Sequence, residues 1–143
     1  RSRCGRRRCT TGISILKDGK VIYTDDEATG GSHMTMTVAG HYRIPYEEAE
    51  VLKTQPEKEA EIFPVIKATV EKMALITEKF LKGYQVPAVY VVGGSSMFTE
   101  FTSVFEKRLH LPVYRPVHPL LVTPLGIAYC CQLPELSSKK EVK

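Results

Sequence analysis

Two pairs of glycines stand where the backbone could lie directly against a ligand. Residues 89–101 read VYVVGGSSMFTEF, so an apolar, strand-like run ends at Gly93-Gly94 before helical spacing resumes, and Gly30-Gly31 follows another strand-like run. A helix N-terminus presents free N–H groups and glycine lets a ligand approach them, which suits a phosphate, a ribose or a purine ring. The G-x-G-x-x-G spacing and the Walker lysine are both absent. A tight turn or a hairpin end therefore explains these glycines about as well.

A third candidate is the sequence EEAEVLK. Glu50 and Lys53 are three residues apart and share one face of the expected helix. In isolation, such a pair is most simply interpreted as a surface ion pair. No catalytic residue or metal site is expected, because no aspartate precedes a glycine-rich loop and the four cysteines lack zinc-site spacing.

The elements that would position these residues alternate between strands and helices. We expect a hairpin over 10–31, helices over 32–40, 42–53, 59–81, 97–109 and 120–131, and strands over 88–92 and 112–114. Asp18-Gly19 favours a type I′ hairpin turn, because both central residues of that turn need positive φ. Pro45 suits a first helical position, and Pro64 falls in the first turn of its helix. The all-apolar strand 88–92 is typical of a central strand that is covered on both faces.

The length and charge indicate a single soluble domain. The 143 residues include no apolar run of membrane-spanning length and no apolar signal segment, so we expect a cytoplasmic protein without a membrane partner. Five arginines lie within residues 1–9, and without them the formal charge of +4 becomes −1. We expect no specific nucleic-acid binding from such a tail.

These features together resemble one protein family. The stretches DEATGGSHMTMTVAG, IPYEEAEVLK, YVVGGSSM and VTPLGIA are similar to the ethanolamine-utilisation family EutJ, which belongs with the actin-like ATPases and Hsp70. The resemblance covers residues 10–128. It implies an α/β fold that forms the second half of an actin-like (RNase H-like) ATPase, with a mixed sheet covered by helices. The domain would span 10–131, between an aberrant tail at 1–9 and a solvated tail at 132–143.

The resemblance also implies an ATP or ADP site with Mg²⁺. Thr10 and Thr11 would end the second phosphate loop, Glu50 and Lys53 would lie beside the ribose and adenine, and Gly126 would be a packing glycine. The implied nucleotide-binding residues are Thr10, Thr11, Gly30, Gly31, Glu50, Lys53, Gly93, Gly94 and Ser95.

By the same resemblance, a full-length relative would be a chaperone-like or reactivating factor of ethanolamine utilisation. Its partners would be enzymes of that pathway or proteins of a bacterial microcompartment. The 143-residue chain lacks the first phosphate loop and its carboxylates, so we expect it to be inert as an ATPase. The alternative is a non-catalytic interaction module with an actin-like fold that recruits or scaffolds partners.

The sequence departs from the family at its beginning. The family pattern places a buried strand ending in Asp-hydrophobic-Gly-Gly-Gly before Thr10, whereas this chain has RSRCGRRRC. Five arginines could not occupy a buried strand, since each unpaired charge would cost several kcal/mol. Permitted codons for residues 3–8, read one base later, encode Asp-Val-Gly-Gly-Gly. We hypothesise that residues 1–9 are an out-of-frame translation of the phosphate loop.

Overall fold

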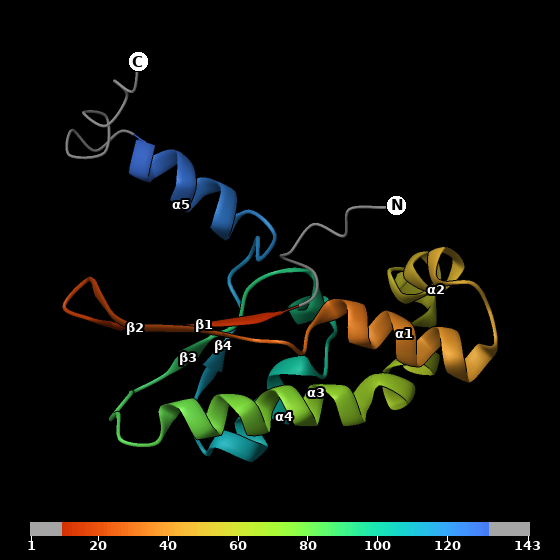
Figure 1. The fold of residues 1–143 in the computed structure, drawn as a ribbon, viewed down its shortest axis with the longest axis horizontal. Helices are drawn as coiled ribbons and strands as arrows, with labels where there is room; N and C mark the ends of the chain where they lie inside the picture. The colour runs from red at the N-terminus through yellow and green to blue at the C-terminus, as the bar shows by residue number, and fades with distance from the viewer. Residues whose placement is uncertain (1–9, 132–143) are drawn as a thin grey trace.

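The part of the chain that the computed structural model describes, residues 10–131, opens with a β-hairpin (Figure 1). Strand β1 (Thr11–Lys17) pairs antiparallel with β2 (Lys20–Glu27). Asp18 and Gly19 have φ of 52° and 75°, which confirms the turn with two positive-φ residues. Ile13 and Ile15 are buried on one face of β1, as their alternation predicts.

The helices follow the predicted order. They are α1 (Gly31–Tyr42), α2 (Tyr46–Lys53), the 3₁₀ turn η2 (Pro56–Lys58), α3 (Glu59–Leu81), the 3₁₀ turn η3 (Gly94–Met97), α4 (Phe101–Leu109) and α5 (Val122–Cys131). Three predicted details are wrong. Pro45 is the extended N-cap of α2, with ψ of 153°, and not its first helical residue. Pro64 is the sixth residue of α3 and therefore lies beyond the first turn. The helix expected from Met97 begins at Phe101, because residues 94–97 close into a 3₁₀ turn.

A second sheet joins β3 (Val89–Tyr90) to β4 (Val113–Tyr114) in parallel. The prediction of a central strand covered on both faces is wrong. Val91 is buried, but Tyr90 and Val92 are 71% and 44% exposed, and within residues 10–131 β3 pairs only with β4. The Tyr90 and Tyr114 rings lie 5.5 Å apart on the uncovered face. The apolar run at 88–92 therefore forms a strand with one buried face, which carries Val91, and one exposed face, which carries Tyr90.

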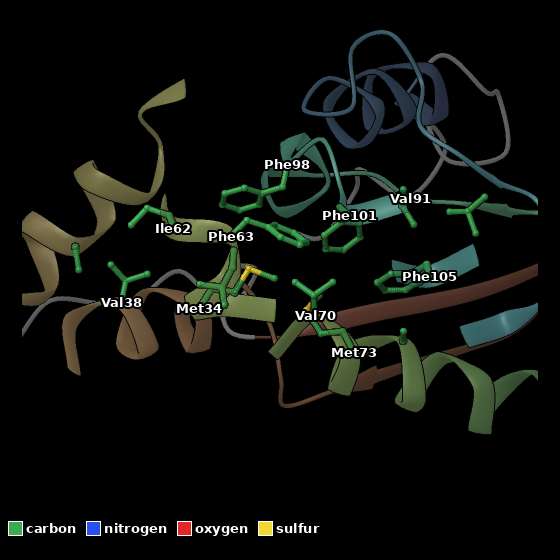
Figure 2. Close-up of a cluster of buried hydrophobic side chains, with 14 residues drawn as sticks. Met34, Val38, Ile62, Phe63, Val70, Met73, Val91, Phe98, Phe101 and Phe105 are labelled. Atoms are coloured by element: carbon green, nitrogen blue, oxygen red, sulfur yellow. The ribbon is translucent and has the colours of Figure 1, made fainter. Parts of the chain in front are cut away.

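The core lies where α3 meets α1, α4 and the second sheet (Figure 2). The predicted stripe of α3 is confirmed at Ile62, Ile66 and Val70, which are at most 1% exposed. Burying each such side chain stabilises the fold by roughly 1.5–3 kcal/mol. Met34 and Val38 bring α1 into the same cluster, so the core fixes the beginning of α1 relative to α3.

Helix α5 projects away from this core (Figure 1). The described side chains of α5 are all exposed, including Leu125 at 64%, Ile127 at 49% and Tyr129 at 67%. The prediction that Gly126 packs against a neighbour is wrong, since a Cβ there would meet nothing within 4 Å. The predictions for residues 1–9 and 132–143 fall outside the described residues.

Candidate functional site

The first group of predicted site residues joins the beginning of β1 to that of α1. A Cβ at Gly30 would lie 2.7 Å from the Thr10 carbonyl oxygen, so only glycine fits this approach. The Thr11 hydroxyl donates a hydrogen bond to the Thr29 carbonyl, and the Gly30 N–H donates to Nδ1 of His33 at 3.2 Å. The absence of a side chain at Gly30 is therefore explained by packing within the chain.

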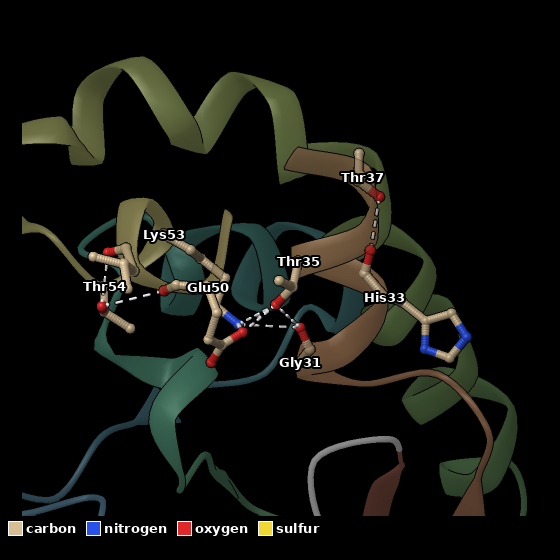
Figure 3. A network of polar contacts seen from close by, with 8 residues as sticks. Gly31, His33, Thr35, Thr37, Glu50, Lys53 and Thr54 are labelled. Atoms are coloured by element: carbon tan, nitrogen blue, oxygen red, sulfur yellow. Dashed lines mark hydrogen bonds and ion pairs between the residues drawn. The ribbon is translucent and has the colours of Figure 1, made fainter. Parts of the chain in front are cut away.

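The second group is a polar cluster of Gly31, Thr35, Glu50 and Lys53 (Figure 3). The Lys53 ammonium donates to the Gly31 carbonyl at 3.2 Å, to the Thr35 hydroxyl at 2.6 Å and to the Glu50 carboxylate at 2.8 Å. The Thr35 hydroxyl in turn donates to the same carboxylate. These contacts hold α2 against the first turn of α1.

The polar cluster differs from an ordinary surface ion pair in its burial. The side chains of Lys53 and Glu50 are only 11% and 30% exposed, and Thr35 is fully buried. Charges at this depth are less screened by salt than surface charges. The Lys53 ammonium donates its hydrogen bonds to groups of the cluster, whereas the Glu50 side chain remains partly exposed to solvent. A partner group would therefore meet the carboxylate rather than the ammonium.

Thr35 is a member of the polar cluster that the sequence analysis missed. Threonine is unfavourable inside a helix, so its place in the middle of α1 is the one local signal of a tertiary role. Besides the Gly31 carbonyl in its own helix, at 3.1 Å, its partners are Glu50 and Lys53, which are 15 and 18 residues away in the sequence and could not be inferred from spacing.

The third group is the glycine–serine turn of residues 93–96. Gly93 has φ of 90°, and a Cβ there would meet nothing within 4 Å, so the space in front of it is open. The buried Ser96 hydroxyl donates to the Gly93 carbonyl at 2.7 Å, and the Gly93 N–H donates to the Pro119 carbonyl at 2.9 Å. Gly94 is exposed and Ser95 is half-buried. The turn thus combines a fixed backbone with an open outer side.

The three groups lie on one side of the molecule. Gly30 and Gly31 are consecutive, which joins the first group to the polar cluster. The teal segment that contains η3 lies beside the beginning of α1 in Figure 1 and near the Glu50 and Lys53 side chains in Figure 3. We take the polar cluster and the glycine–serine turn together as the candidate site.

Several residues outside the candidate site have perturbed pKa values. A hydrogen bond from Lys58 lowers the pKa of Glu61 below its ordinary value, and partial burial followed by the nearby Glu61 charge raises that of Tyr42. Tyr23 has a raised pKa because its hydroxyl donates to Asp25. Within residues 10–131 there is no cluster of three or more His, Cys, Asp or Glu suited to a metal, and no helix is long and apolar enough to cross a membrane.

Comparison with known proteins places the chain among relatives of similar fold. A family model described as type IV pilus assembly protein PilM matches residues 7–119. The ethanolamine utilization protein EutJ of Salmonella typhimurium is 46% identical over 120 residues, and that of Escherichia coli is 44% identical. Each match covers 83% of this chain but only 42% of the relative, so the chain spans less than half of their length.

Solved structures agree with this assignment. The crystal structure of EutJ from Carboxydothermus hydrogenoformans matches with a TM-score of 0.80 and 47% identity, covering 85% of this chain and 46% of that one. The PilM–PilN type IV pilus biogenesis complex matches at a TM-score of 0.74 and 17% identity, over 88% of this chain and 44% of that one, which shows a shared fold. The predicted actin-like α/β fold is confirmed. The chain therefore belongs to the PilM family, has the actin-like ATPase fold and is similar over most of its length to part of EutJ.

Proposed function

We propose that the chain carries the nucleoside-binding side of an ATP or ADP site in an EutJ-like protein of ethanolamine utilisation. One observation carries the proposal: a partly exposed carboxylate, fixed by Lys53 and Thr35 at the beginning of α1, lies on the same side as a rigid turn that is open at Gly93. The similarity to EutJ supplies the pathway.

The residues present fit a nucleoside. The Glu50 carboxylate can accept hydrogen bonds from ribose hydroxyls, and Lys53 keeps the carboxylate in position without needing to contact the ligand. A purine ring can lie against the bare backbone of Gly93 and Gly94, where side chains are absent. Binding at these positions requires little rearrangement, because the turn and the carboxylate are already held in place.

The phosphates would extend toward Thr10, Thr11, Gly30 and Gly31, bringing Mg²⁺ with them. When bound, the triphosphate supplies the phosphoryl group for transfer, whereas the residues of this chain bind and orient the nucleoside. Hydrolysis also needs positioned metal and water. Within residues 10–131 no acidic cluster of that kind is present, so we propose that the chain alone does not hydrolyse ATP.

For the whole protein we propose a chaperone-like or reactivating role in the cytoplasm. Its partners would be enzymes of ethanolamine utilisation or proteins of a bacterial microcompartment. The names of the relatives support the pathway, and the actin-like fold is compatible with a nucleotide-dependent change in partner binding.

The test is titration of the chain with ADP and a pair of glycine variants. Gly94→Val places a side chain on the turn, where a Cβ would meet only Leu120 Cδ2 at 3.7 Å, so the fold should tolerate it. Gly40→Val is the control, because Gly40 is also exposed and its Cβ would meet nothing. We expect ADP binding that weakens about tenfold or more in Gly94→Val only, which corresponds to ~1.4 kcal/mol. Absence of binding, or equal binding by both variants, would contradict the proposal.

A second candidate function is a non-catalytic interaction module. The observation in its favour is the apolar surface of α5, where Leu125 and Ile127 are exposed. A helix that is apolar on all sides is usually buried against another part of a protein, so a partner protein could bind this surface. Pull-down of purified ethanolamine-utilisation enzymes separates the two functions. If the chain is a scaffold, the Gly94→Val variant should still capture these enzymes and the Leu125→Gln variant should not. If the wild-type chain captures none of these enzymes, scaffolding of them is excluded.

A further inference from the structure

Arg115 makes an unusual set of contacts with the end of the glycine–serine turn and with the two residues that follow it. Its Nη1 donates to three consecutive carbonyl oxygens, those of Ser96 at 2.8 Å, Met97 at 3.0 Å and Phe98 at 3.4 Å. Arg115 is otherwise an exposed residue, and among the residues that the structure describes it forms no ion pair. Its charge is therefore directed at the backbone of the turn.

The parallel sheet explains how Arg115 reaches this place. The Val91 N–H donates to the Tyr114 carbonyl, and the Gly93 N–H donates to the Pro119 carbonyl, each at 2.9 Å. The chain that follows β4 consequently runs beside the chain that follows β3. An arginine directly after β4 can extend its side chain across to the end of the turn.

The Ser96 and Met97 carbonyls need a donor from outside the turn, whereas the Phe98 carbonyl also accepts a hydrogen bond from the Phe101 N–H at 3.1 Å. The last carbonyls of a helix or 3₁₀ turn lack partners within it. A guanidinium N–H forms a stronger hydrogen bond to them than a neutral donor would. At the other end of the turn, the Ser96 hydroxyl and the Pro119 carbonyl hold Gly93. Both ends are thus fixed, while Gly94 in the middle stays exposed.

We propose that Arg115 is a positioning residue for nucleotide binding: by holding the carbonyls of residues 96–98, it keeps the turn in the shape that receives the nucleoside. This inference rests on the nucleoside-binding function proposed above. A turn that is already ordered loses less entropy when the ligand binds, so Arg115 contributes to affinity without touching the ligand.

The first arm of the test measures the turn without nucleotide. Arg115→Met removes the donors, Arg115→Lys keeps a charged donor on a shorter side chain, and Arg108→Met is the control, since Arg108 is an exposed arginine that pairs with Glu78 at 2.7 Å. We expect hydrogen exchange of the Gly93 and Ser96 amides to rise about tenfold in Arg115→Met, less in Arg115→Lys and not in Arg108→Met. Unchanged exchange in Arg115→Met would overturn the proposal.

The second arm measures the dissociation constants of adenosine and ADP for the same variants. We expect Arg115→Met to weaken both ligands by the same factor of about five or more, with partial rescue in Arg115→Lys and an unchanged thermal midpoint in all variants. A greater loss for ADP than for adenosine would show that Arg115 acts on the phosphates, and unchanged affinity would show a purely structural contact. Either result would overturn the positioning role.

The two arms separate this proposal from the function on which it rests. If the wild-type chain binds neither ligand, the nucleoside-binding function fails, and the role of Arg115 in binding fails with it. The exchange arm still decides whether Arg115 orders the turn. If the wild-type chain binds and Arg115→Met does not change affinity, only the role of Arg115 fails.

Discussion

Replacement of Lys53 by methionine should destabilise the protein far more than an ordinary surface substitution. The change removes the three donors that the ammonium directs to Gly31, Thr35 and Glu50. It also removes the ammonium that pairs with the Glu50 carboxylate, whose side chain is 30% exposed. Breaking a fully buried pair costs about 3–5 kcal/mol and breaking an exposed pair about 0–1 kcal/mol. We therefore expect a loss of about 2 kcal/mol, which lowers the thermal midpoint by roughly 6–10 °C.

The chain contains a matched control for this experiment. Lys58 and Glu61 form an ion pair with the same spacing and the same distance of 2.8 Å, but their side chains are 48% and 53% exposed. Lys58→Met should lower the thermal midpoint much less than Lys53→Met does, since water screens that pair. The comparison holds the sequence spacing and the ion-pair distance constant, so a larger effect of Lys53→Met arises from the burial of Lys53 and from its two further hydrogen bonds, to Gly31 and Thr35.

Thermal unfolding followed by circular dichroism measures both variants, and a double variant identifies the cause. If the cost arises from an uncompensated carboxylate, Glu50→Gln combined with Lys53→Met should be more stable than Lys53→Met alone. The reasoning is refuted if Lys53→Met lowers the midpoint no more than Lys58→Met does. It is also refuted if the double variant is the less stable one.

Three further predictions concern two glycines and the pH dependence of stability. Gly30→Ala should destabilise the protein by about 1–3 kcal/mol, because its Cβ would lie 2.7 Å from the Thr10 carbonyl oxygen. Gly40→Ala, in the last turn of α1 with open space around it, should stabilise the protein by up to about 0.5–1 kcal/mol, and denaturant titration measures both variants. The lowered pKa of Glu61 means that its contribution to stability is present above the ordinary carboxyl value and is lost as the pH falls through the lowered value. Glu61→Gln should therefore remove part of the loss of stability that occurs as the pH falls below the ordinary carboxyl value of about 4.5, whereas an unchanged pH profile would show that its pairing with Lys58 contributes nothing.

Local patterns predicted much of the fold correctly. The positive-φ turn at Asp18-Gly19 follows from two residue types, and the buried face of α3 follows from the spacing of Ile62, Ile66 and Val70. These features depend only on neighbours in the sequence.

The features that the sequence did not reveal depend on distant contacts. The apolar strand at 88–92 could not show that Tyr90 would face outward, because hydrophobicity alone does not tell which face is covered. The later start of the helix expected from Met97 is the exception, because it follows from a local hydrogen bond of Ser96 to Gly93, three residues earlier. Thr35 reaches Glu50 and Lys53 only after α1 and α2 are packed together, and Arg115 reaches the carbonyls of residues 96–98 only after the parallel sheet is formed.

The candidate site shows the same division. The pairing of Glu50 with Lys53 was predictable from helical spacing, but its burial against α1 was not. The sequence suggests the same role for Gly30 and Gly93, a close approach of the backbone to a ligand, but their surroundings in the structure differ. Gly30 is required by the approach of Thr10, whereas Gly93 has open space before it.

Nuclear magnetic resonance titration of the isotopically labelled chain with ADP tests the nucleoside site most directly. Saturable shifts should occur together at the amides of Gly93, Gly94 and Ser95 and at those of Gly31 and Thr35, because both groups lie on one side of the molecule. Shifts that do not saturate, or that occur only outside these two groups, would contradict nucleoside binding at this site.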